Sequence, residues 1–221
     1  MPTYYDYNAV RVEGEDPGLD GAELVTAADR LLRGLSHRRI EFDDPLAGAR
    51  LRPALEDAGY VCERLAWMHR AAAPPPGPPG VEELPFADTR ELRARWHRGE
   101  DWSGDEPAVL RFLDDQDAVA ARRGLRAFAV REAGEPVAFA TLLEQGDAVE
   151  IEQVFALPHR RGAGLGSQLI AAALHAGARE TAWIVADEDG RPKRLYARLG
   201  FVPAWLQYAF VRYPESHRPP A

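Results

Sequence analysis

A run of ten residues, AAAPPPGPPG at positions 71–80, restricts the fold of this chain more than any other feature of its sequence. Proline fixes the backbone angle φ and has no N–H donor, so this run forms neither the interior of a helix nor a central strand. It predicts an extended, polyproline-type linker between a segment of residues 1–70 and a longer segment of residues 81–215. The last residues, 216–221, are expected to form a flexible tail.

The composition is that of a globular protein, with 46% hydrophobic and 28% charged residues among 221. The net charge of −8 argues against a general nucleic-acid binder and against a protein that binds anionic membranes. Cys62 is the only cysteine, so we expect no intrachain disulfide, no cysteine-based cluster and no bound metal. The first residues lack the features of a signal peptide, and no apolar run approaches the ~20 residues of a membrane span, so a cytoplasmic location is expected.

Apolar periodicity and chain-breaking residues predict an alternating order of helices and strands after the linker. Helices are expected at 91–98, 108–123, 164–179 and 192–199, and strands at 126–131, 136–143, 149–157, 182–186 and 201–213. This order describes a mixed α/β sheet with helices on both faces.

The turn between the third of these strands and the helix after it is rich in glycine and arginine. Gly162, Gly164 and Gly166 occupy alternate positions at the start of the helix, and Arg160 and Arg161 precede them. Glycines let several N–H groups approach one ligand, and the helix N-terminus and the guanidiniums add positive charge, so the pattern predicts a pyrophosphate site. The turn lacks the lysine of a Walker loop and the glycine spacing of a dinucleotide fingerprint. The alternative is that the glycines only tighten the connection.

Two short motifs in this segment resemble those of one known family. RGAGLG at 161–166 follows a strand that ends at Pro158, and LYARLGF at 195–201 lies on the last expected helix. They are similar to the Arg/Gln-x-x-Gly-x-Gly/Ala and Leu-Tyr-x-x-x-Gly-Phe motifs of the GNAT N-acetyltransferase superfamily. The predicted elements from Val81 to Tyr213 also follow the family's order, so the resemblance covers the whole second segment and implies the GNAT acyl-CoA N-acyltransferase fold.

The resemblance also implies where acetyl-CoA, the co-substrate, would bind. In GNAT enzymes the fourth strand splays from the fifth, and the thioester lies in the gap. Backbone groups of Val154, Phe155, Ala156 and Leu157 would pair with the pantetheine arm, and one of their amides would stabilise the oxyanion. The remaining cofactor-binding residues would hold the pyrophosphate at the turn: Arg161, Gly162, Ala163, Gly164, Gly166 and Ser167.

By the same resemblance, Tyr196 occupies the position of the general acid that protonates the departing thiolate. A phenol titrates near ~10 and a thiol near ~8.5, so tyrosine can donate this proton at neutral pH. Without the resemblance, Tyr196 is a half-buried aromatic residue on an amphipathic helix. The sequence departs from the family pattern before this tyrosine, where Asp189 and Pro192 replace the usual Asn and Ala.

The candidate general bases are Glu152, the first choice, and Glu150, the second. Alternation along Val149–Val154 puts both on one face of a central strand, where carboxylates are costly unless they are solvated in a cleft or paired. The resemblance implies a glutamate base on this strand, which in many relatives acts through a water molecule. The alternative is that both carboxylates only line a wet groove or pair with arginines.

The segment before the linker hints at an internal repeat. Strands are expected at 7–12 and 39–42, with a helix at 22–34 between them. Five positions follow at the offsets found in the second segment, where Gly59, Tyr60, Val61, Leu65 and Trp67 correspond to Gly200, Phe201, Val202, Leu206 and Tyr208. On this hypothesis, residues 1–70 form a truncated, degenerate GNAT-like half that is catalytically silent, because Leu55 stands at the position of Tyr196. A chance match over five positions is the alternative.

Together these features predict an acetyltransferase that transfers an acetyl group from acetyl-CoA to an amine by direct attack in a ternary complex. The lone cysteine lies in the degenerate segment, which disfavours a ping-pong route. We expect a small-molecule or peptide amine as acceptor, no nucleic-acid or membrane partner, and a monomer or homodimer. The alternatives are a non-catalytic CoA-binding or regulatory module, a plain interaction domain, and an O-acyltransferase on the same fold.

Overall fold

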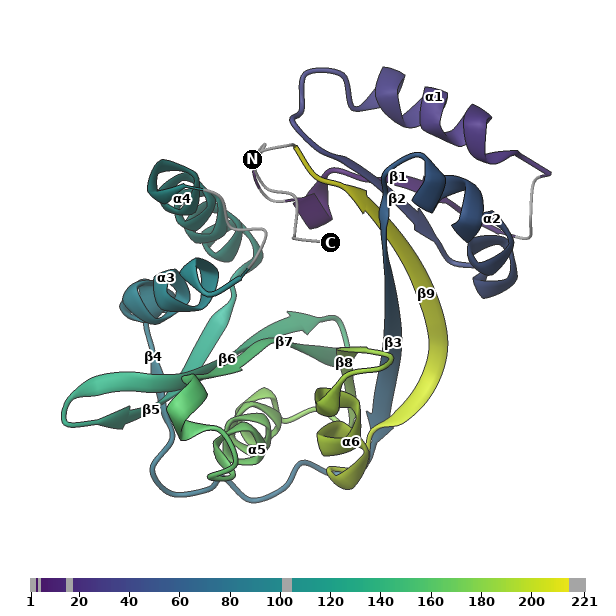
Figure 1. Ribbon diagram of the computed structural model, residues 1–221. Helices are drawn as coiled ribbons and strands as arrows, with labels where there is room; N and C mark the ends of the chain where they lie inside the picture. The colour runs from purple at the N-terminus through teal and green to yellow at the C-terminus, as the bar shows by residue number, and fades with distance from the viewer. Residues whose placement is uncertain (1–2, 4, 15–17, 101–104, 215–221) are drawn as a thin grey trace.

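The structure, a computed structural model, describes residues 3, 5–14, 18–100 and 105–214, so the tail expected at 216–221 lies outside the described residues (Figure 1). The strands are β1 (Val10–Val12), β2 (Arg38–Phe42), β3 (Val61–Ala71), β4 (Glu82–Leu84), β5 (Arg126–Glu132), β6 (Glu135–Gln145), β7 (Ala148–Ala156), β8 (Thr181–Asp187) and β9 (Val202–Arg212). The α-helices are α1 (Gly21–Leu31), α2 (Pro45–Asp57), α3 (Arg90–Arg98), α4 (Glu106–Arg123), α5 (Leu165–Gly177) and α6 (Arg191–Arg198). Three short 3-10 helices complete the described elements: η1 (Tyr5–Tyr7), η2 (Phe86–Thr89) and η3 (Pro158–Arg160).

The described strands form one mixed sheet in the order β1-β2-β9-β3-β8-β7-β6-β5-β4. β1 pairs with β2, and β7 with β8, in parallel, and the other neighbours are antiparallel. β9 lies between β2 and β3, so the segments on the two sides of the proline-rich run share one sheet. The mixed α/β sheet expected from the sequence is confirmed.

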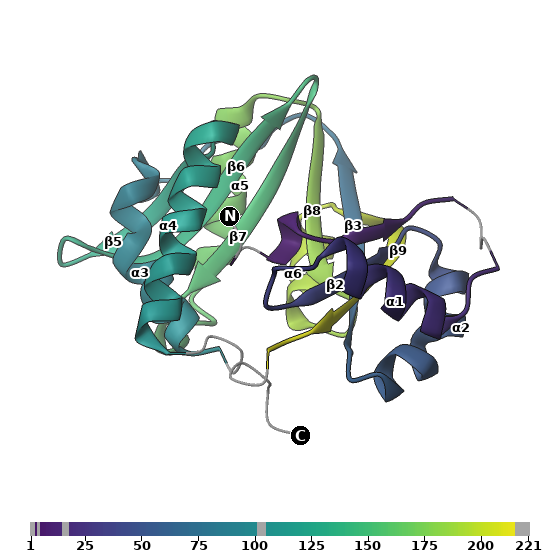
Figure 2. The ribbon, with the colours of Figure 1, turned by 90° about the horizontal axis from the view of Figure 1, so that it is seen from above.

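Helices cover both faces of this sheet. α5 and α6 lie against one face of β6, β7 and β8, and α1 and α2 cover β1, β2 and β9 (Figure 1). α3 and α4 lie on the opposite face, where Trp96 of α3 stacks on Phe155 of β7 with ring centroids 5.0 Å apart. From above, α3 and α4 stand beside β6 and β7, well apart from α1 and α2 (Figure 2). On the face opposite α5 and α6, α3 and α4 therefore cover the side of the sheet formed by β6 and β7 (Figure 2).

In the first segment, β2 begins one residue before its expected range, α1 ends three residues before its expected end, and β1 begins three residues late, but the periodicity did not predict α2. α2 begins after Asp44, whose carboxylate accepts from Leu46 N (2.9 Å), and it contains Pro53 in its interior. An interior proline costs a helix about 3 kcal/mol, so it reads as a break in the sequence. Burial of Leu51 and Leu55 offsets this cost, since both are at most 4% exposed.

The sheet has a twofold pattern. β1-α1-β2-α2-β3 and β7-α5-β8-α6-β9 share the order strand–helix–strand–helix–strand, and each half begins with a parallel strand pair. The third strand of each half pairs with the second strand of the other half, which makes the order β1-β2-β9-β3-β8-β7 palindromic. Gly59 and Gly200 end α2 and α6 with φ of 84° and 89°. The internal repeat remains a prediction, and this is the topology that such a repeat would produce.

The proline-rich run is anchored to the second segment. Ala71 is the last residue of β3, and Ala72 N donates to Glu180 O at 3.0 Å. His175 Nδ1 of α5 lies 3.1 Å from Pro75 O, so the run passes along α5 rather than away from the protein. The domain boundaries at 70 and 81 remain predictions.

Candidate active site

The site is built around an irregularity in β7. Gln153 has φ of 52°, and the pairing with β6 shifts register here, so β7 carries a bulge. Among the described residues, β7 pairs with β8 only over Ala148–Ile151 and Thr181–Ile184. Beyond these residues the two strands separate, and β8 does not pair with Val154–Ala156 at the end of β7. This is the splay that the sequence motifs implied.

A glycine-rich turn leads from the end of β7 into α5. Gly164, the N-cap, has φ of 80°, a conformation that strains any side chain, and no side chain caps the helix. The N–H groups of the first helical turn thus lack a capping partner and remain available to an anion. A Cβ atom on Gly166 would lie 3.1 Å from Leu195 Cδ2 of α6, so glycine keeps the space between the two helices open.

A cavity of about 450 Å³ opens at this turn. Its walls come from the end of β7, the turn, the first turn of α5, and α6. The lining residues are Val154, Phe155, Ala156, Arg160, Arg161, Gly162, Gly164, Leu165, Gly166, Ser167, Arg191, Pro192, Leu195, Tyr196 and Arg198.

The lining carries only positive formal charge, although the whole chain has a net charge of −8. Arg160, Arg161, Arg191 and Arg198 line the cavity, and its lining includes no carboxylate. Arg160 pairs with Glu132 outside the cavity, and the Arg161 guanidinium lies 6.0 Å from the Phe155 ring centroid. Guanidiniums beside an uncapped helix N-terminus suit a phosphate or pyrophosphate ligand.

The cavity brings together eight of the ten cofactor-binding residues expected from the sequence, all except Leu157 and Ala163. Leu157 is 8% exposed and its N–H donates to Val137 O at 3.0 Å, so that amide is not free for a pantetheine arm. Ala163 lies in the turn but outside the lining. The sequence analysis missed Arg191 and Arg198. Their spacing could have indicated them, because Arg191, Leu195 and Arg198 occupy positions i, i+4 and i+7 and so lie on one face of the helix.

Tyr196, which the family resemblance made the candidate general acid, reaches the cavity from α6. It is 5% exposed and its ring lies 6.4 Å from that of Phe201. Burial raises the pKa of the Tyr196 hydroxyl to about 12, because an apolar environment disfavours the phenolate. The hydroxyl therefore keeps its proton throughout the physiological pH range and can act as a donor.

Glu150 and Glu152 lie on the other face of β7, outside this cavity and next to the splay. Arg123 of α4 donates to Glu152 Oε1 at 3.0 Å and also to the hydroxyl of Tyr7. Glu150 Oε2 instead accepts from Gln145 Nε2 at 3.0 Å, a neutral partner. Of the two carboxylates, only that of Glu152 forms an ion pair with a cation among the described residues.

The two carboxylates differ in pKa accordingly. Burial, with a smaller effect from the charge of Glu152, raises the pKa of Glu150 to about 7, although Arg123 opposes the shift. Burial also raises the pKa of Glu152, against the direct pull of Arg123. Next to them, the hydroxyl of Thr141 is buried and has no hydrogen-bond partner among the described residues. A carboxylate with a pKa of about 7, that of Glu150, thus lies close to the buried hydroxyl of Thr141.

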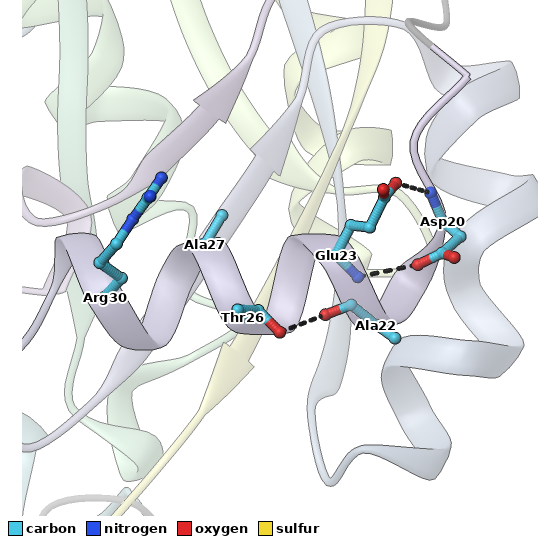
Figure 3. A pocket seen from close by; sticks show the side chains of 6 residues that line it. All are labelled: Asp20, Ala22, Glu23, Thr26, Ala27 and Arg30. Carbon is cyan, nitrogen blue, oxygen red and sulfur yellow. Dashed lines mark hydrogen bonds between the residues drawn. The ribbon is translucent and has the colours of Figure 1, made fainter.

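A second pocket, of about 360 Å³, lies on the outer side of α1 (Figure 3). Asp20 accepts from Glu23 N at 2.8 Å, and the Glu23 carboxylate accepts from Asp20 N at 3.2 Å, which closes a capping box. Farther along, Thr26 donates to Ala22 O at 2.8 Å. The helix that corresponds to α5 in the first half is therefore capped by its own carboxylates, which repel an anion.

No group of three or more His, Cys, Asp or Glu side chains in the described ranges is arranged to hold a metal ion. None of the helices built from those residues has the length and hydropathy needed to cross a bilayer.

Several solved structures share this fold. The chain is similar to a functionally unknown conserved protein from Staphylococcus epidermidis, with 13% identity and a TM-score of 0.76 over 96% of this chain and 87% of that one. It is similar to a GCN5-related N-acetyltransferase from Kribbella flavida, with 23% identity and a TM-score of 0.53 over 91% and 80% of the two chains. A tandem GNAT protein from the clavulanic acid biosynthesis pathway matches with 16% identity and a TM-score of 0.56 over 96% and 76%. Each match spans both segments of the chain.

No match to the chain was found among curated protein sequences. The family model described as the Acetyltransferase (GNAT) family matches residues 86–201, more than half of the chain and all of the cavity described above. This protein therefore belongs to the GNAT acetyltransferase family.

Proposed function

We propose that the protein is an acetyl-CoA-dependent N-acetyltransferase that works by direct transfer in a ternary complex. The observation that carries this proposal is that Tyr196 and the glycine-rich turn line one cavity, at the point where β7 leaves β8. Family membership supports acetyl-CoA as the co-substrate. The uncapped N-terminus of α5 and the arginines around it fit the pyrophosphate of that molecule.

The residues of the cavity divide into two groups. Gly162, Gly164 and the first turn of α5 would offer N–H groups to the pyrophosphate, with Arg161 and Arg191 supplying charge. Backbone groups of Val154–Ala156, which β8 does not pair, would hold the pantetheine arm, and one of these amides would stabilise the charge that develops on the carbonyl oxygen. Acetyl-CoA itself supplies an acetyl group that is activated as a thioester.

For the base we favour Glu150 over Glu152. A base must be free to accept a proton near the working pH, and Glu150 has a pKa of about 7 and no directly bonded cation. Glu152, held by Arg123, would instead attract the ammonium form of the acceptor. This reverses the order of preference drawn from the sequence, because the sequence did not reveal that Arg123 contacts Glu152.

With these roles, the proposed reaction has one proton acceptor for the amine and one proton donor for the departing thiolate. Glu150, directly or through a water molecule, takes a proton from the amine as the nitrogen–carbon bond forms. As the carbon–sulfur bond breaks, Tyr196 donates its hydroxyl proton to the sulfur. The two residues act from opposite faces of β7, so the splay between β7 and β8 is where the acceptor and the thioester would meet.

The test is release of free CoA thiol from acetyl-CoA in the presence of a panel of primary amines. We expect turnover by the wild type, and a fall in kcat of about 100-fold for Tyr196→Phe with unchanged affinity for acetyl-CoA. Tyr60→Phe is the matched control, because it removes another buried hydroxyl, far from the cavity, and should leave kcat unchanged. If Tyr196→Phe is fully active at every pH, the general-acid role is wrong. Acetyl-CoA binding without turnover of any amine would support the non-catalytic module instead.

A further inference from the structure

Three tryptophans from three different strands meet on the sheet face opposite α5 and α6. Trp67 of β3 stacks on Trp205 of β9 with ring centroids 5.0 Å apart and planes 11° apart. Trp183 of β8 packs against Trp205 at 5.3 Å with planes 55° apart. Because side chains alternate along a strand, these rings point away from the core, into which their neighbours Met68 and Ile184 point.

These rings are not buried by any described element. Trp205 is 40% exposed, and Trp67 and Trp183 are partly exposed. The indole N–H of Trp67 donates to Gln207 Oε1 at 2.9 Å, which fixes the orientation of the ring. Burial of an indole side chain removes a large apolar area from water and is therefore strongly favourable. Three indoles that remain exposed to solvent in a fixed arrangement thus indicate a binding surface rather than a core.

The tryptophan surface is continuous with the proposed base. Glu150 of β7 is the register partner of Trp183 in the parallel pair β7–β8. Register partners in a sheet point to the same face, and neighbouring strands lie about 4.8 Å apart. Glu152 points to the same face two residues farther along, where the splay begins. A ligand on the indoles can therefore place a group at the carboxylates and the thioester together.

The chemistry of the two parts is complementary to one type of molecule. Carboxylates pair with an ammonium group, and indole faces attract flat apolar rings and cations. Two carboxylates at one end and three indoles at the other fit a molecule with an amine at one end and a ring at the other. A long aliphatic polyamine would place charges over the indoles but would leave their apolar area unused.

We propose that the acceptor is a primary amine carried on an aromatic body, with the amine at Glu150 and Glu152 and the ring against Trp183 and Trp205. This inference rests on the proposed acetyltransferase function and names the class of its acceptor. The aromatic body provides affinity, and the carboxylates orient the nitrogen toward the splay.

The test compares 2-phenylethylamine with ethylamine, which presents the same amine without the ring, and with spermidine. We expect kcat/KM for 2-phenylethylamine to exceed that for ethylamine by at least about tenfold. Trp183→Leu and Trp205→Leu should each remove most of this difference by raising KM for 2-phenylethylamine much more than KM for ethylamine. Quenching of the intrinsic tryptophan fluorescence by 2-phenylethylamine, without acetyl-CoA, should be lost in the same variants.

The outcomes separate this inference from the proposed function. If no amine is acetylated, the proposed function fails, whereas the fluorescence titration still tests the aromatic site. If amines are acetylated but the ring makes no difference, or the tryptophan variants behave as the wild type, the inference is overturned. A preference for spermidine over 2-phenylethylamine overturns it in favour of a cationic chain. A wild-type dimer that becomes a monomer in Trp205→Leu, with unchanged amine kinetics, overturns it in favour of a second copy of the chain.

Discussion

Two glutamates on one strand differ in this structure because of a single arginine. The alternation in the sequence predicted that Glu150 and Glu152 share a face, and they do. Burial raises the pKa of both, and Arg123, which precedes Glu152 by 29 residues and comes from another element, opposes that rise and bonds directly only to Glu152. Sequence spacing cannot reveal that contact, so it could predict the pair but not the roles within it.

This difference predicts distinct pH profiles for two similar variants. With a base of pKa about 7, kcat/KM of the wild type should rise with pH through about 7 and then level off. Glu150→Gln should lower kcat about 100-fold and abolish this limb. Glu152→Gln should retain the limb but shift it to lower pH, because the charge that helps to raise the pKa of Glu150 is removed. The measurement is kcat/KM from pH 5.5 to 9, and a wild-type limb in Glu150→Gln would contradict the assignment.

Thermal melting provides the control for folding. The pKa of Glu150 in the folded protein lies above its ordinary value, so the folded state holds this proton more tightly than the unfolded chain does. The contribution of Glu150 to stability is therefore greatest at low pH and decreases as pH rises from about 4.5 to 7. Glu150→Gln removes this loss, so its Tm at pH 8 should equal or exceed that of the wild type. A lower Tm would mean that lost activity reflects misfolding.

At the scale of elements, the two corresponding helices α1 and α5 begin in opposite ways. α1 starts with a capping box of Asp20 and Glu23, whereas α5 starts at Gly164 without a cap. The glycine-rich turn could be predicted because left-handed backbone requires glycine and leaves a signature in the sequence. α2 could not be predicted, because its stability comes from burial against β9, which is more than 140 residues away in the chain.

A prediction at this scale concerns α3 and α4, which cover the face of β6 and β7. The Arg93 guanidinium is fully buried and donates to Thr89 Oγ1 at 3.0 Å, Gln116 Oε1 at 2.9 Å and Asp117. Arg93→Met should lower the free energy of unfolding by about 2 kcal/mol, because it leaves the buried Gln116 Oε1 without this donor, whereas Asp117 keeps its ion pair with Arg90. The measurement is urea unfolding followed by circular dichroism.

The control lies on the same helix. Arg95 pairs with Glu91 at 3.3 Å, and both side chains are more than half exposed. Arg95→Met should therefore change the free energy of unfolding by less than about 1 kcal/mol. Equal losses for the two variants would show that the buried network does not hold α3 to α4.

At the scale of the whole molecule, the order of the strands in the sheet could not be predicted from the sequence. Two motifs were sufficient to predict the fold of the second segment, because they occur at fixed places in one known architecture. They said nothing about β9 passing between β2 and β3, since antiparallel pairing over such distances leaves no local pattern. The proline-rich run was predicted as extended, but its contacts depend on His175 of α5 and on Glu180 just before β8, which are far away in the sequence.

The contribution of the first segment to the site becomes visible only when the whole sheet is considered. β1, β2 and β3 extend the sheet beyond β8 and carry Trp67 to the face that bears the proposed base. η1 brings Tyr7 to Arg123, and Thr3 Oγ1 donates to Asp115 of α4 at 2.6 Å, so the start of the chain bridges the two sides of this face. On the proposed function, the first segment would therefore shape the acceptor side of the site without carrying the motifs of the second.

The central claim is that the glycine-rich turn binds acetyl-CoA, and titration calorimetry with acetyl-CoA tests it most directly. Gly164→Glu places a carboxylate at the uncapped start of α5. Gly134→Glu is the matched control, because both glycines have positive φ, 80° and 87°, with nothing within 4 Å of a Cβ atom, but Gly134 lies in the β5–β6 turn. We predict that the wild type and Gly134→Glu bind acetyl-CoA alike and that Gly164→Glu binds at least about 100-fold more weakly. No binding by a folded wild type, or equal binding by all three proteins, would contradict the account.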